Sequence, residues 1–134
     1  AELAPAAAAF LRRRLQAVLA TQSRERPGFP SLSAVPYALD PGGWLLGLYS
    51  RLAPHHPNLL ADGRCALLVA QDNAGDILTG ERLELTCAGR LLVDDGEVAA
   101  ARETWVRCYP RADAWFRQLD FEFFRLDVLA ARYN

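Results

Sequence analysis

The sequence contains no lysine and no methionine, and the first of these absences limits its chemistry directly. All 15 of its basic side chains are arginines. Without lysine, no side chain can form a Schiff base with a carbonyl substrate. Arginine keeps the positive charge, and its planar fork of donors suits phosphate groups. Imine-forming catalysis by lysine is therefore excluded, whereas recognition of an anionic ligand is not.

The sequence also lacks a charge excess and a long hydrophobic run. Its formal net charge is −1 at pH 7, so no basic surplus draws the chain toward nucleic acid or anionic lipid. The apolar run near the N-terminus, residues 3–11, is too short to span a membrane and lacks the basic start of a signal peptide. We therefore expect a cytoplasmic protein with no nucleic-acid or membrane partner.

Cysteine is scarce, and its spacing does not indicate a metal site. Cys65, Cys87 and Cys108 lie far apart, and no C-x-x-C pair occurs. His55 and His56 are adjacent, and adjacent side chains diverge on a helix or a strand, so they rarely hold one ion together. We expect three reduced thiols and no metal.

The remaining composition predicts a single domain over residues 1–134. The chain is 51% hydrophobic, enough to build a core at this length. Apolar runs, period-two patterns and turn signals predict six strands, at 17–21, 31–39, 44–49, 65–70, 83–93 and 121–132. The Asp40-Pro41-Gly42-Gly43 turn predicts a hairpin between the second and third of them. Pro36 in the second strand indicates an edge, a bulge or a ligand-facing backbone.

Helices are expected around this sheet. Residues 6–16 are rich in good helix formers, and a short helix follows the loop in 50–63, with Gly63 expected to cap its end. Asp94 followed by Glu97 resembles a capping box and begins a helix. Residues 110–119 indicate a further helical piece, and residues 71–81 a polar connection. Hairpins without βαβ alternation favour an antiparallel barrel over a Rossmann sheet.

The segment 49–59 carries the richest chemistry. Ser50, Arg51, His55 and Asn58 offer a hydroxyl, a guanidinium, an imidazole and an amide, next to the free N–H groups of a helix start. Together they suit an anion such as phosphate. The alternative is that these side chains only satisfy the backbone of the loop. Residues 31 and 33 share a face of the second strand, which is either exposed or turned toward a ligand.

Two blocks of sequence resemble the FMN-binding split-barrel family related to pyridoxamine 5′-phosphate oxidase, including its haem-utilisation branch. Residues 28–40 show the pattern G-x-P-x-x-S-x-x-P-Y-A-L-D, and residues 50–62 show S-x-L-A-x-H-x-x-N-L-x-A-D. The resemblance covers roughly residues 11–132. It implies a mainly β (α+β) fold, a six-stranded antiparallel split β-barrel with flanking helices, in a homodimer with FMN at the interface.

The resemblance also implies which residues hold the cofactor. Serine hydroxyls from both blocks would donate to the phosphate, the polar residues of the second block would surround it, and the second strand would line the flavin. FMN would then be preferred over riboflavin, which has no phosphate. The residues expected at the cofactor are Ser33, Val35, Pro36, Tyr37, Tyr49, Ser50, Arg51, His55 and Asn58.

Departures from the family pattern leave the reaction open. Relatives that oxidise pyridoxamine phosphate use an arginine and a lysine in the strand matching 31–37, and a C-terminal tryptophan and arginine; none of these is found here. Haem-degrading relatives use a later histidine, also missing. We expect little or no pyridoxamine phosphate oxidase activity. The hypotheses are a flavin-dependent oxidoreductase of a small molecule with FMN or a deazaflavin, a haem-binding or haem-degrading protein, and a cofactor-free structural dimer.

Overall fold

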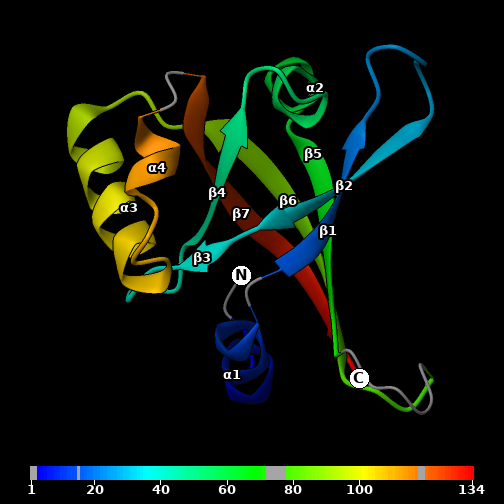
Figure 1. Cartoon of the computed structure of the whole chain (residues 1–134). Coiled ribbons are helices and arrows are strands. Elements are labelled where there is room, and N and C mark those ends of the chain that lie inside the picture. The colour runs from blue at the N-terminus through cyan, green and yellow to red at the C-terminus, as the bar shows by residue number, and fades with distance from the viewer. Residues whose placement is uncertain (1–2, 15, 72–77, 118–119) are drawn as a thin grey trace.

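The computed structural model describes residues 3–14, 16–71, 78–117 and 120–134, and its strands follow the predicted ones closely (Figure 1). The second predicted strand is divided in two, which gives a seven-stranded sheet. The strands are β1 (Gln16–Gln22), β2 (Pro30–Pro36), β3 (Ala38–Leu39), β4 (Leu45–Ser50), β5 (Arg64–Ala70), β6 (Arg82–Leu91) and β7 (Phe121–Tyr133).

The two edge strands of this sheet are neighbours in sequence. The strand order is β2-β1-β5-β6-β7-β4-β3, and every ladder is antiparallel. Only Tyr37 separates β2 from β3, so the curled sheet brings its edges together at this residue (Figure 1). Among the described residues, no ladder joins β2 to β3 or β4. The fold is therefore the predicted split barrel, open along one seam.

The predicted hairpin is correct only beside its turn. Ala38–Leu39 pairs with the start of β4, whereas residues 30–36 pair with β1 instead. The turn itself forms as expected, with Gly43 at a φ of 86° and the Asp40 carboxylate accepting from the Trp44 N–H at 2.8 Å. Beyond the turn, the curvature of the sheet carries the first half of the predicted strand to the opposite edge. Pro36 accordingly ends an edge strand, as its residue type predicted.

Hydrophobic residues form two cores, one on each side of β4. Leu45 and Tyr49 face the inside of the curled sheet, where they join a cluster with Leu67 and Phe124. Leu46 and Leu48 alternate with them and face outward, into a second cluster. Residues 45–49 of β4 are therefore buried without interruption, the pattern of a strand covered on both faces.

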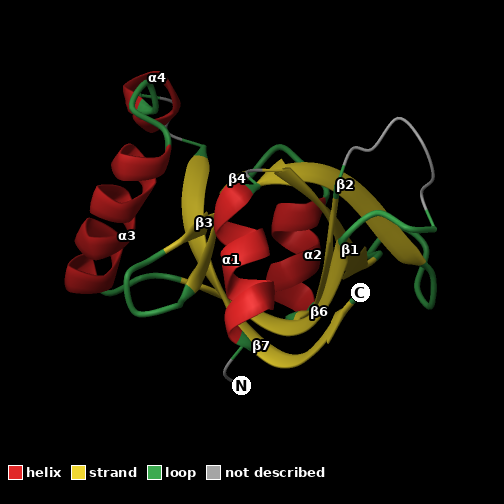
Figure 2. Cartoon of the chain, turned by 90° about the horizontal axis from the view of Figure 1, so that it is seen from below, coloured by secondary structure: helices red, strands yellow, loops and turns green. Residues whose placement is uncertain are grey.

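In the described residues, four helices surround the sheet: α1 (Pro5–Arg13), α2 (His55–Ala61), α3 (Asp95–Cys108) and α4 (Asp113–Phe116). Helix α1 lies across one end of the curled sheet and α2 lies at the other end (Figures 1 and 2). Helices α3 and α4 lie outside the sheet, where Trp105 of α3 forms the centre of the outer core. None of the helices in the described part of the chain is long and apolar enough to cross a membrane.

Three details of the helix predictions differ from the structure. The first helix ends at Arg13, so residue 16 belongs to β1. Gly63 does not end α2 in a left-handed conformation, because Asp62 is the extended C-cap. Gly63 is instead required by close packing, since a Cβ there would lie 2.5 Å from the Gly89 carbonyl oxygen. Parts of the predicted 71–81 connection and 110–119 helical piece, at 72–77 and 118–119, lie outside the described residues.

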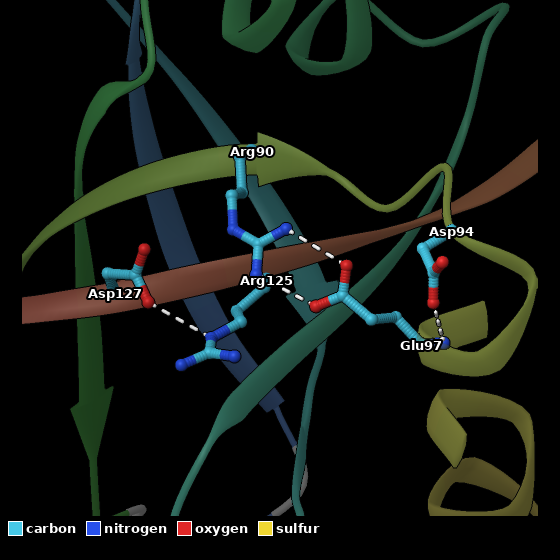
Figure 3. Close-up of polar contacts among 5 residues, drawn as sticks. All are labelled: Arg90, Asp94, Glu97, Arg125 and Asp127. Atoms are coloured by element: carbon cyan, nitrogen blue, oxygen red, sulfur yellow. Dashed lines mark hydrogen bonds and ion pairs between the residues drawn. The ribbon is translucent and has the colours of Figure 1, made fainter. Parts of the chain in front are cut away.

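An ion pair attaches the start of α3 to β6, next to two arginines that meet across the β6–β7 ladder (Figure 3). Arg90 and Arg125 are directly opposite each other across the ladder, a repulsive arrangement for two cations. Each is compensated by a carboxylate: Arg90 pairs with Glu97 at 2.9 Å, and Arg125 with Asp127 at 3.0 Å. Glu97 therefore holds α3 to the sheet, instead of completing the predicted capping box.

The other half of that box is present, because the Asp94 carboxylate accepts from the Glu97 N–H at 3.0 Å. We predict that Asp94→Ala lowers the free energy of unfolding by about 1 kcal/mol, the usual cost of losing an N-cap. Asp95→Ala, one residue further along the first turn, is the matched control and should cost less. Urea denaturation of both variants provides the measurement. Equal losses in the two variants would show that charge near the helix start, not the cap, is responsible.

Candidate cofactor pocket

A pocket of about 320 Å³ opens where the seam of the barrel separates β2 from β4. Its walls come from both sides of the seam: Ala34, Val35 and Pro36 from β2, and Leu48, Tyr49 and Ser50 from β4. The remaining lining residues are Ala53, His55, Trp115 and Phe121. The pocket thus combines apolar and aromatic surface with a hydroxyl and an imidazole, the usual character of a small-molecule site.

A larger hollow of about 540 Å³ lies between α1, the 40–43 turn and β7. It contains none of the residues predicted to bind a cofactor. Its charged lining residues, among those that the structure describes, are Arg12 and Asp127, and Asp127 is paired with Arg125. The smaller pocket is the better candidate site, because it gathers polar groups from distant segments around an apolar wall.

His55 is held in place by the opposite strand. Its Nδ1 lies 3.0 Å from the Ser33 Oγ, so the first helical residue of α2 is tied to β2 across the seam. Its ring also contacts Tyr49 edge-on, at 4.9 Å between ring centroids. Burial and the neighbouring His56 lower the pKa of His55 from its usual value of 6.5. The imidazole is consequently neutral at pH 7, with Nδ1 engaged and Nε2 without a hydrogen bond to any described residue.

His56 points elsewhere, as expected for adjacent residues. Its Nε2 lies 2.8 Å from a Glu122 carboxylate oxygen, and its ring is almost fully buried against Phe124. It therefore anchors α2 to β7 and does not line the pocket. In the described part of the chain, no group of three or more histidine, cysteine or acidic side chains could hold a metal ion.

Ser50 lies at the edge of the pocket and is bound to a carboxylate. Its hydroxyl donates to the Asp120 Oδ2 at 2.5 Å, and its Oγ accepts from the Leu52 N–H at 3.1 Å. The Arg51 N–H in turn donates to the Asp120 carbonyl at 2.6 Å. The segment after β4 is thus fixed to the residue that precedes β7.

The other predicted site residues occupy different surroundings. The Arg51 side chain is exposed next to Ser50. Tyr37 is buried, and its hydroxyl donates to the Leu11 carbonyl at 2.6 Å, away from the pocket. Asn58 is also buried: its amide donates to the Thr21 hydroxyl and accepts from the Arg24 N–H, both at 3.1 Å. For Asn58 this is the loop-stabilising arrangement that was the alternative to ligand binding.

Several pocket residues were not anticipated. Trp115 and Phe121 contribute its aromatic wall, and Asp120 lies behind Ser50. They come from the α4–β7 region, some seventy residues beyond Ser50 in the chain, as the Ser50–Asp120 separation shows. No local pattern in the sequence marks them, because their positions depend on how β7 pairs with β4.

Comparison with known proteins assigns the chain to a family. The sequence model of the pyridoxamine 5′-phosphate oxidase family matches residues 3–134. The chain therefore belongs to this family, in agreement with the split-barrel fold and with the resemblance seen in residues 28–40 and 50–62.

Three similar proteins illustrate the range of this family. A chloroplast haem oxygenase, HOZ, from Arabidopsis thaliana is 35% identical over 116 residues, which are 87% of this chain and 35% of HOZ. The structure of a haem-binding protein from Mycobacterium smegmatis has a TM-score of 0.82 and 29% identity, covering 99% of this chain and 55% of that one. Atu2129, a protein of unknown function from Agrobacterium tumefaciens, has a TM-score of 0.87 and 26% identity, covering 96% and 55%. The chain spans about a third of HOZ and about half of the other two proteins.

The environment of His55 leads to a prediction about pH. Because folding lowers its pKa, the folded state binds fewer protons, so stability rises with pH through this window and falls below about pH 6.5. We predict that an NMR titration of the folded protein places the His55 ring below pH 6.5, with the resonance assigned through His55→Gln. The free energy of unfolding of that variant should also decrease less on acidification than that of the native chain. A midpoint at or above 6.5 would contradict the neutral imidazole.

Proposed function

We propose that this pocket binds a planar redox cofactor and that FMN is the first candidate. One observation supports this most strongly: five of the residues expected at the cofactor, from the separate segments 28–40 and 49–59, line one pocket, namely Val35, Pro36, Tyr49, Ser50 and His55. Its apolar wall suits a flat ring system, and its polar edge suits the tail of an amphipathic cofactor. The inferred function is that of a flavin-dependent oxidoreductase acting on a small molecule.

In this proposal some pocket residues contact the flavin ring and others contact its phosphate-bearing tail. Val35 and Pro36 would contact the flavin ring, while Ser33, Arg51 and His55 would lie toward the phosphate. A bound flavin would supply the electron transfer, and the chain would supply orientation and polarity. His55 would act as a hydrogen-bonding group and not as a counter-ion at neutral pH, because burial lowers its pKa. A deazaflavin would use the same ring contacts.

Haem is the second candidate, and two observations favour it. The Arabidopsis and Mycobacterium relatives, at 35% and 29% identity, are named as a haem oxygenase and a haem-binding protein. With its Nδ1 proton donated to Ser33, the neutral His55 ring would also present Nε2 in the form in which histidine binds metals. An apolar pocket with one such imidazole would suit haem iron as well as a flavin.

A homodimer forms the other part of the proposal. Apolar side chains gather on the outer face of β2, β1 and β5, where Val18 lies directly opposite Leu68 and Ala34. Leu32 on the same face is 69% exposed. Ala34 also lines the pocket, so a second copy packed on this face would border the bound cofactor. A cytoplasmic location stays a prediction from the sequence.

The cofactor proposal is tested by titrating the protein in parallel with FMN and haem. We predict that one of them binds and that Ala53→Phe, which fills the pocket, weakens its binding by about tenfold or more, or about 1.4 kcal/mol. Ala61→Phe, at the exposed end of α2, is the matched control and should bind normally. Flavin fluorescence quenching and the haem Soret band report the two ligands.

The outcomes separate the hypotheses. Tight FMN binding without a Soret shift supports the flavoprotein, and the reverse supports a haem protein. Binding of neither leaves a cofactor-free dimer. If Ala53→Phe binds as well as the native chain, the cofactor site lies elsewhere.

The dimer proposal has its own test. We predict that the native chain sediments as a dimer at micromolar concentration and that Leu68→Glu shifts it toward monomer, because a charge would be buried in the interface. Val93→Glu is the control, since Val93 is exposed at 78% and lies away from the outer face of β1 and β5. A native protein that sediments as a monomer would remove both the interface and the interfacial cofactor site.

A further inference from the structure

The only proton of the Ser50 hydroxyl is already used within the protein. A serine hydroxyl has one donor and two acceptor lone pairs. Here the donor is directed to the Asp120 carboxylate at 2.5 Å, and one lone pair accepts from the Leu52 N–H at 3.1 Å. What remains for a ligand at Ser50 is an acceptor. This is the reverse of what a phosphate requires, because a phosphate oxygen needs donors.

Asp120 cannot easily leave this position. Its carbonyl accepts from the Arg51 N–H at 2.6 Å, and the next residue, Phe121, pairs with Ser50 in the β4–β7 ladder. Main chain and side chain therefore hold the same residue against the 50–52 segment. A phosphate oxygen within hydrogen-bond distance of the Ser50 Oγ would lie no further than about 5.5 Å from the Asp120 Oδ2, since two consecutive hydrogen bonds span that distance at most. At that separation two negative charges repel each other strongly.

We propose that Asp120 is a specificity-determining residue of the pocket, which withholds the Ser50 proton and places a negative charge where a phosphate would bind. The inference rests on the proposed cofactor pocket and refines its ligand class. The Ser50 edge of the pocket selects a group that donates a hydrogen bond, such as a hydroxyl, over a phosphate. Contacts at Ser50 therefore make the affinity for FMN little higher than the affinity for riboflavin, although the family pattern places a phosphate donor at Ser50.

The decisive variant is Asp120→Asn, which removes the charge and leaves a neutral amide oxygen, a weaker acceptor than a carboxylate, so that a phosphate can compete for the Ser50 proton. We expect the ratio of FMN to riboflavin affinity to rise by about tenfold or more, the scale of one charge-dependent hydrogen bond. Riboflavin affinity itself should change little. Asp95→Asn is the matched control, because it removes the same charge from the start of α3, away from the pocket. Calorimetric titration gives all four affinities, and thermal unfolding checks that the variants are folded.

Ser50→Ala, made in both backgrounds, tests the mechanism. If Asp120 holds the serine proton, the substitution weakens FMN binding only slightly in the native chain and about tenfold in Asp120→Asn, where the hydroxyl is free to turn. Equal losses in the two backgrounds would mean that Ser50 donates to phosphate despite Asp120, and would overturn the inference.

Inorganic phosphate separates this inference from the cofactor proposal. If neither flavin binds to any variant, the FMN proposal fails, and phosphorus NMR titration with inorganic phosphate then decides on Asp120 alone. Stronger phosphate binding by Asp120→Asn than by Asp95→Asn supports the inference. Equal or undetectable phosphate binding by both overturns it, as does an unchanged FMN to riboflavin ratio when flavins do bind.

Discussion

The arrangement of the whole molecule depends on one backbone corner, Tyr37, where the chain passes from one edge of the sheet to the other. Its side-chain hydroxyl donates to the Leu11 carbonyl at the end of α1, and its carbonyl accepts from the Tyr109 hydroxyl after α3 at 2.7 Å. Burial raises the pKa of the Tyr37 phenol, so the group stays a neutral donor at physiological pH. Two helices and two strands are thus fixed to a single residue, and the seam of the barrel begins there.

The chemistry of the pocket follows from what this seam brings together. Ser33 belongs to the edge strand β2, and His55 belongs to α2, the helix that follows β4. Their contact therefore crosses the seam of the barrel. Ser50 meets Asp120 because β7 pairs with β4. Each side chain is positioned by an ordinary element, but the combination of hydroxyls, imidazole and carboxylate exists only in the folded barrel. Which polar groups line the pocket therefore depends on the strand topology as well as on the sequence motif.

Local patterns in the sequence were sufficient for the strands and for the Asp94 cap, because alternation and capping depend on neighbouring residues. They were insufficient for the pairing of 31–39, since its first half joins β1 only after the sheet has curled. The family resemblance correctly indicated the fold and placed Val35, Pro36, Ser50 and His55 where a pocket lies. It could not indicate that Asn58 donates a hydrogen bond to Thr21 or that Asp120 accepts one from Ser50, because both hydrogen bonds join distant segments of the chain.

The missing ladder along the seam also affects how a ligand can enter. In the rest of the barrel, separating two strands would break a row of backbone hydrogen bonds. Among the described residues no ladder joins β2 to β4, and the Ser33–His55 contact that links β2 to α2 is between side chains. Local openings of low free energy occur where few backbone bonds must be lost. Opening the pocket between β2 and β4 would therefore leave the ladders intact. Entry of a bulky cofactor along this seam would cost no backbone ladder.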